Sequence, residues 1–92
     1  MAHTPKEKQK LLARVRRIRG QVEALERALE AEKGSAEVLQ QIAAVRGAIN
    51  GLMTEVIEDH VLTQVVHPSI TDDAARAKGA EELVEVVRAY LR

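Results

Sequence analysis

The stretch LLARVRRIRGQVEALERAL, residues 11–29, carries the clearest structural pattern of this 92-residue chain. Its apolar residues recur at spacings of 4, 3, 4, 3 and 4, the repeat of a helix that packs along one side. These residues are Leu11, Val15, Ile18, Val22, Leu25 and Leu29. The pattern predicts a long helix with one apolar stripe, called the apolar seam below.

Sequence signals on both sides of this stretch set the limits of the helix. Thr4 and Glu7 frame Pro5 in the arrangement of a capping box with proline at the first helical position. Gly34 is typical of the residue that ends a helix. We therefore expect the first helix to span about residues 5–32.

The rest of the chain indicates two further helices. The apolar seam is repeated with the same spacing by Val38, Ile42, Val45, Ile49, Leu52 and Val56. Ser35 is a typical helix cap and Pro68 ends a helix, which predicts a second helix over about 36–66. A third is expected over about 72–91, interrupted by Gly79. No segment has the pattern of a strand, so the fold class is all-α.

Composition limits the chain to one domain, residues 1–92, without cysteine chemistry. Hydrophobic residues make up 46% of the sequence, which excludes a disordered chain, and there is no cysteine to form a disulfide or a thiolate metal site. No apolar run approaches the roughly 20 residues that span a bilayer, and no secretory signal is present. We therefore expect a cytoplasmic protein without a membrane partner.

The length of the helices predicts an oligomer. A first helix of about 27 residues is roughly 40 Å long, whereas a compact chain of this size has a diameter of roughly 30 Å. Two such helices in a hairpin cannot cover each other's apolar seams. We expect a second copy to do so, in an antiparallel four-helix-bundle dimer.

Basic residues gather near the N-terminus although the whole chain is neutral. Residues 1–19 hold 7 bases and 1 acid, a net +6, and the remaining 73 hold 7 bases and 13 acids, a net −6. One helix face, called the basic row, carries Lys6, Lys10, Arg14 and Arg17 at spacings of 4, 4 and 3. This row favours contact with nucleic-acid phosphates; a merely solvated face is the alternative.

Three histidines are candidate metal ligands: His3, His60 and His67. His60 and His67 are seven residues apart, which predicts one shared side of the second helix with Gln64 between them. Removal of the initiator methionine would place a free amine on Ala2 beside His3. Such nitrogen donors suit a divalent transition metal, namely nickel, cobalt, zinc or copper. The alternative for His60 and His67 is a charge cap at the helix end.

Two long segments carry a resemblance to a known family. RVRRIRGQVEALERALE (14–30) and LQQIAAVRGAINGLMTEVIEDH (39–60), with VVRAYLR (86–92), resemble the CsoR/RcnR/FrmR family of repressors that sense copper, nickel and cobalt, or formaldehyde. The amino-acid sequence of these segments is most similar to the formaldehyde branch. The resemblance implies a three-helix subunit, a four-helix-bundle dimer and a disc-shaped tetramer made of two dimers. It also implies that operator DNA is bound without effector and released with it.

The resemblance assigns roles to individual residues. It places DNA-contacting charge at Lys10, Arg14, Arg16, Arg17, Arg19 and Arg46. It places the effector set at Ala2, His3, Ser35, His60, Gln64 and His67. Ser35 departs from the family cysteine and Gln64 from a histidine of the nickel/cobalt branch. Since a serine hydroxyl is a far weaker nucleophile than a thiolate, the remaining set favours nickel or cobalt over formaldehyde.

Two other classes of protein fit a small helical dimer. A chorismate-mutase-type enzyme would hold a dianionic substrate with Arg14 and Arg46, but the seam spacing places these cations at the edge of a bundle and not inside it. A helical scaffold without DNA binding is the second alternative. The charge pattern and the resemblance favour a repressor that is not an enzyme.

Overall fold

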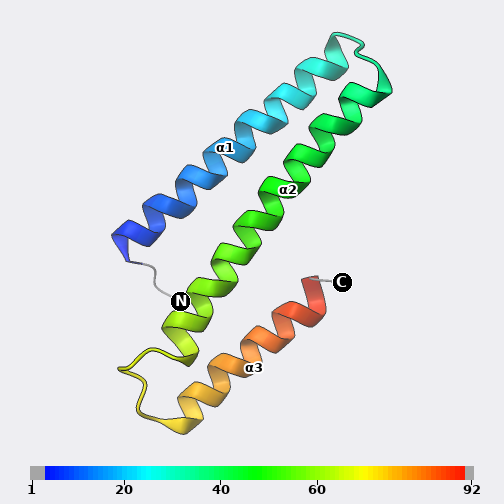
Figure 1. The fold of residues 1–92 in the computed structure, drawn as a ribbon. Coiled ribbons are helices and arrows are strands. Elements are labelled where there is room, and N and C mark those ends of the chain that lie inside the picture. The colour runs from blue at the N-terminus through cyan, green and yellow to red at the C-terminus, as the bar shows by residue number, and fades with distance from the viewer. Residues whose placement is uncertain (1–3, 91–92) are drawn as a thin grey trace. The chain divides into compact units, whose positions relative to one another are not determined.

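A computed structural model describes residues 4–90, and no strand occurs in that range. The elements are α1 (Pro5–Glu30), α2 (Ser35–His60), the π-helical turn η1 (Val61–Val65) and α3 (Asp73–Tyr90) (Figure 1). The predicted all-α, three-helix subunit is confirmed. Among the described helices, none is long and apolar enough to cross a membrane.

The chain divides into two compact units near residue 55. The first unit is a hairpin of α1 and residues 35–54 of α2, which run side by side in opposite directions (Figure 1). The second unit contains the last turn of α2, followed by η1 and α3, and α3 packs against η1. The basic row belongs to the first unit, and His60, Gln64 and His67 belong to the second.

The start of α1 follows the predicted capping box. The backbone N–H of Glu7 donates to Thr4 Oγ1 at 3.1 Å, and the Thr4 N–H donates to Glu7 Oε2 at 3.3 Å. Pro5 occupies the first helical position, where its missing N–H costs no hydrogen bond. The basic row therefore begins on a helix whose first turn is fixed.

The end of α1 differs from the prediction that Gly34 stops the helix. Glu32 takes the left-handed conformation, with φ of 55°, and no described glycine has a positive φ. The Lys33 N–H donates to the Ala28 carbonyl at 3.0 Å and the Glu32 N–H to the Leu29 carbonyl at 3.1 Å, the two bonds of a Schellman motif. The helix thus ends through backbone bonds that use Glu32 where glycine is the usual residue.

Both ends of α2 differ in detail from the prediction. The Gly34 carbonyl accepts the first bond of the helix, from Val38 N–H at 3.1 Å, so Gly34 and not Ser35 takes the cap position. At the other end the regular helix stops at His60, and the expected last turn is the π-helix η1. Within it Thr63 Oγ1 donates to the Asp59 carbonyl at 2.7 Å, a bond that is known to bend helices.

Gly79 does not interrupt α3, contrary to the prediction. The helix starts with Asp72 Oδ1 accepting from Ala74 N–H at 3.0 Å and continues through Gly79, which is buried. A Cβ at this position would collide with the backbone carbonyl of Gln64 and lie 3.2 Å from the Gln64 Cβ. Glycine is present here because η1 and α3 approach too closely for any side chain.

The apolar seams of α1 and α2 each divide into two rows with a period of seven residues. The half-buried row comprises Leu11, Ile18, Leu25, Val38, Val45 and Leu52. The exposed row comprises Val15, Val22, Leu29, Ile42, Ile49 and Val56, which are 37–58% exposed. Ala28 is the one apolar residue classed as buried within the described part of the chain. A single copy therefore leaves half of each seam in contact with water.

Candidate nucleic-acid interface and effector site

Three of the four basic-row residues meet on one face of α1. Lys10, Arg14 and Arg17, with Ala13, line a hollow of about 260 Å³, and their side chains are exposed. Lys6 is also exposed but does not line this hollow. A concave surface with three cations can contact the phosphates of a nucleic acid.

The other predicted DNA-contacting residues are exposed but lie apart from this hollow. Arg16 and Arg19 are on other sides of α1, as their positions along the helix require. Arg46 is exposed on α2. None of the three lines the hollow of the basic row.

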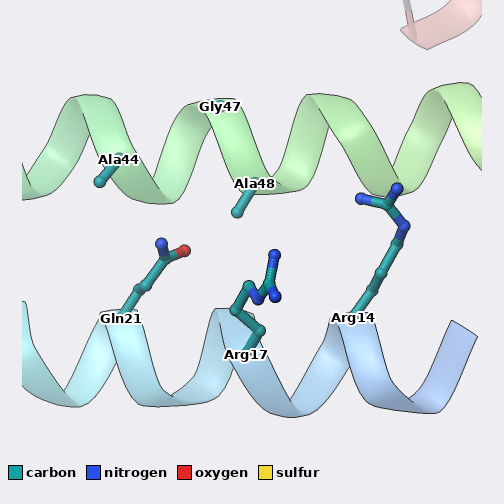
Figure 2. A pocket seen from close by; sticks show the side chains of 6 residues that line it. All are labelled: Arg14, Arg17, Gln21, Ala44, Gly47 and Ala48. Carbon is teal, nitrogen blue, oxygen red and sulfur yellow. The ribbon is translucent and has the colours of Figure 1, made fainter.

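A second cavity lies inside the hairpin, between α1 and α2 (Figure 2). It has a volume of about 310 Å³ and is lined by Arg14, Arg17, Gln21, Ala44, Gly47 and Ala48. Figure 2 shows the long side chains of α1 pointing toward the small residues of α2. Gly51 continues this small face, and a Cβ there would lie 3.0 Å from Arg14 Nη1. Because α2 is small at these positions, the guanidinium groups can enter the space between the helices.

His60 presents one specific ring nitrogen to a ligand. It is half-buried at the end of α2, and its Nε2 donates a hydrogen bond to the Gly79 carbonyl at 2.8 Å. Since a carbonyl only accepts, Nε2 carries the proton of the neutral ring and Nδ1 holds the lone pair. Histidines that bind a metal through one ring nitrogen typically donate a hydrogen bond from the other, as Nε2 does here. The arrangement favours metal binding through Nδ1.

His67 does not share a helix face with His60, and that prediction is wrong. η1 ends at Val65, before Pro68, so His67 lies in the following turn. The backbone N–H of Ser69 donates to His67 Nδ1 at 3.1 Å, and the Ser69 hydroxyl lies 2.8 Å from the same atom. Nδ1 therefore accepts, and Nε2 carries the proton of the neutral ring. In this arrangement His67 stabilises the turn through Nδ1, and that lone pair is not available to a metal.

Gln64 and Ser35 occupy different units of the chain. Gln64 is half-buried in η1, and its Nε2 donates to Thr63 Oγ1 at 3.5 Å. Ser35 is exposed as the first residue of α2. Ala2 and His3 lie outside the described residues. Within residues 4–90, no group of three or more histidine, aspartate or glutamate side chains is placed to hold a metal ion.

Two features that shape these sites are absent from the predictions made from the sequence. The first is the small face of α2, whose signal was present in the helical spacing of Ala44, Gly47, Ala48 and Gly51. The second is Gly79, which packs on η1 and accepts the bond from His60. No local pattern signals the second feature, because it depends on contact between elements.

Comparison with known proteins identifies the family. The sequence profile described as metal-sensitive transcriptional repressor matches residues 7–89. The chain belongs to this family. It is 47% identical over 92 residues to the transcriptional repressor RcnR of Salmonella paratyphi B, with all of both chains covered. An uncharacterized protein in the bioA 5' region of Serratia marcescens is 52% identical with the same coverage.

A solved structure shows the same fold. A variant of the formaldehyde-responsive regulator FrmR from Salmonella enterica serovar Typhimurium matches with a TM-score of 0.84 and 53% identity. The match covers 97% of this chain and 99% of that chain. The resemblance drawn from the sequence is therefore confirmed, and the chain is a transcriptional repressor and not an enzyme. The chorismate-mutase and scaffold alternatives are set aside.

Proposed function

We propose that this repressor binds operator DNA through its basic row and is released by a transition metal, with nickel or cobalt as the preferred ion. The observation that carries the proposal is the meeting of Lys10, Arg14 and Arg17 in one hollow on α1. Arg16, Arg19 and Arg46 are exposed outside this hollow and are the further candidates for phosphate contact. We also propose a cytoplasmic location, because the protein must reach its operator DNA.

Binding of labelled DNA from upstream of the protein's own gene tests the DNA surface. Arg17→Ala should weaken binding of metal-free protein in a fluorescence anisotropy titration. It should also make the slope of log K against log salt concentration less negative, by about 0.9 for each phosphate that the variant no longer neutralises. The matched control is Arg27→Ala, which removes an exposed charge from another side of α1. Equal effects of the two variants would contradict the assignment of the basic row.

A second copy is the partner that best fits the exposed row. Six large apolar side chains at 37–58% exposure repeat with a period of seven along two antiparallel helices. An antiparallel four-helix bundle buries such rows against themselves, and each Å² of apolar surface removed from water contributes about 25 cal/mol. We propose this dimer, and two dimers in a disc-shaped tetramer as the family resemblance implies. Sedimentation equilibrium should detect the tetramer, and a monomer at micromolar concentration would contradict it.

The effector site that we propose centres on His60. Its Nδ1 would hold the ion, while Nε2 keeps its bond to the Gly79 carbonyl at 2.8 Å. The Ala2 amine, His3, Ser35 and Gln64 are the further donors, drawn from the N-terminal arm and from neighbouring copies. Nickel, cobalt, zinc and copper all accept nitrogen ligands of this kind. His67 is the weakest member of the set because its Nδ1 already accepts hydrogen bonds from Ser69.

Release from DNA follows from the position of these donors. Ligation would tie the arm that precedes α1 to helix α2, and this changes the position of the basic row relative to its copies. The DNA affinity then falls because several phosphate contacts depend on the spacing of the rows. By thermodynamic reciprocity, DNA weakens effector binding by the same factor.

Formaldehyde is the second candidate effector because of the similarity to FrmR, which is formaldehyde-responsive. An electrophile needs a nucleophilic partner on the protein. Ser35 supplies a hydroxyl where a thiolate would be reactive, and a hydroxyl is a poor nucleophile at neutral pH without an adjacent base. The chemistry of the described residues therefore favours a metal.

A further inference from the structure

The cavity between α1 and α2 has the chemistry of an anion site. Arg14 and Arg17 point from α1 across the cavity, with Gln21 one turn further along (Figure 2). None of its six lining residues is acidic, and the α2 side offers only Ala44, Gly47 and Ala48. Two guanidinium groups at one small concave site favour an anion with several oxygen atoms, because each group donates paired hydrogen bonds.

Gln21 supports the presence of a polar ligand. Its Oε1 atom is buried and has no hydrogen-bond partner. Leaving such an atom without a partner is unfavourable, because the buried oxygen has lost its hydrogen bond to water. The Gln21 oxygen can accept a hydrogen bond from a protonated oxygen of a ligand. Rotation of the amide by half a turn brings its two N–H donors to the same place, where they can donate to an unprotonated oxygen.

We propose that this cavity binds one oxyanion of the phosphate class, held by Arg14, Arg17 and the Gln21 amide. The proposal rests on the proposed DNA-binding function for one source of the anion, a backbone phosphate of operator DNA. Free phosphate has the same chemistry and would compete for the same site. None of the exposed-row residues lines the cavity, so a partner copy that covers this row does not need to close it.

The small residues of α2 determine whether an anion can enter. Gly47 lines the cavity, and a Cβ there would meet no atom within 4 Å. A larger side chain at this position therefore adds bulk at the edge of the cavity without removing any charge. Such a substitution distinguishes a specific anion site, which depends on space, from the general attraction of a basic surface, which depends on charge alone.

A graded series at Gly47 tests the proposal in the full-length protein. Gly47→Ala and Gly47→Leu place increasing bulk at the edge of the cavity, and both residues favour a helix more than glycine does. Gly20→Leu is the matched control, because a Cβ at Gly20 also meets nothing within 4 Å and Gly20 does not line the cavity. Circular dichroism checks that each variant keeps its helix content. The binding probes are inorganic phosphate in calorimetry and labelled DNA in anisotropy.

The expected result is a loss of anion binding that grows with side-chain size. Gly47→Leu should reduce DNA affinity about tenfold, the factor for one charge-assisted contact, with a smaller reduction for Gly47→Ala. Gly20→Leu should bind DNA like the wild type. If phosphate binds the wild type and displaces DNA more than chloride at equal ionic strength, free phosphate also uses the site. If phosphate does not bind measurably, the reduced DNA affinity assigns the site to the DNA backbone.

Two results would have different consequences. Unchanged DNA affinity and unchanged phosphate binding in Gly47→Leu would overturn the anion site, while salt-dependent DNA binding of the wild type would leave the proposed function intact. If the wild type does not bind DNA, the proposed function fails. Calorimetry with inorganic phosphate then decides the cavity alone, with Gly47→Leu expected to abolish binding and an absence of wild-type binding overturning the site.

Discussion

At the scale of single residues, the two histidines of the second unit differ in whether the ring nitrogen Nδ1 is available to a ligand. His60 Nε2 donates to a carbonyl, and His67 Nδ1 accepts from a backbone N–H. The neutral rings therefore carry their protons on the same atom, Nε2, but only His60 leaves Nδ1 without a hydrogen bond in these contacts. Metals bind the lone pair, so the two residues are not equivalent ligands.

This difference predicts that two alanine variants lose cobalt affinity to different extents. His60→Ala should weaken cobalt binding by at least about tenfold, because it removes the oriented Nδ1 donor. His67→Ala should change cobalt affinity by less than about twofold, because Nδ1 of that ring serves the turn. Titration of the visible absorption of cobalt(II) measures both. A larger loss in His67→Ala than in His60→Ala would reverse the assignment.

The roles of single residues were predictable from the sequence where they depend on interactions between near neighbours in the chain. The bonds between Thr4 and Glu7 depend on neighbours three positions apart and were predictable. The end of α1 was not, because the left-handed residue is Glu32 and the expected Gly34 instead caps α2. The connection between α1 and α2 is short, so the signals for the end of one helix and the start of the next overlap. Residue types alone do not show which residue serves which helix.

At the scale of elements, the contact between η1 and α3 connects the end of α2 to the third helix. Gly79 lets the Gln64 carbonyl approach α3 and accepts the bond from His60. Gln64 belongs to the π-helical turn and His60 directly precedes it, and such turns are frequent at functional sites. The position of His60 therefore depends on how these two elements pack.

Gly79→Ala should lower the free energy of unfolding by about 1–3 kcal/mol, the usual cost of overpacking. This is opposite to the gain expected from the better helix propensity of alanine. Gly20→Ala is the control, with nothing within 4 Å of the added carbon, and should raise the free energy of unfolding by about 0.5–1 kcal/mol. Urea unfolding followed by circular dichroism measures both. Stabilisation by both substitutions would contradict the close packing of η1 on α3.

The helices themselves were predictable from the period of the apolar seam, since heptad spacing depends only on helix geometry. The π-helical end of α2 was not predictable. It separates His67 from His60, which a regular helix would have placed on one side. Similarly, the glycine that was expected to break α3 is explained by a contact with Gln64, far earlier in the chain.

At the scale of the whole molecule, neutrality conceals a strong separation of charge. Seven of the fourteen bases lie in residues 1–19 with one acid. This concentrates positive potential on α1, where a polyanion gains most, while the acidic remainder repels it. In the proposed dimer each copy would supply another basic row, which would link DNA affinity to oligomerisation.

In the proposed mechanism, metal-free repressor holds operator DNA and an ion at His60 releases it. The most direct measurement is the fluorescence anisotropy of the preformed DNA complex as nickel or cobalt is added. The anisotropy should fall to that of free DNA for the wild type and stay high for His60→Ala, which keeps its basic row. Failure of nickel, cobalt, zinc and copper ions alike to release the wild-type protein from DNA would contradict this mechanism.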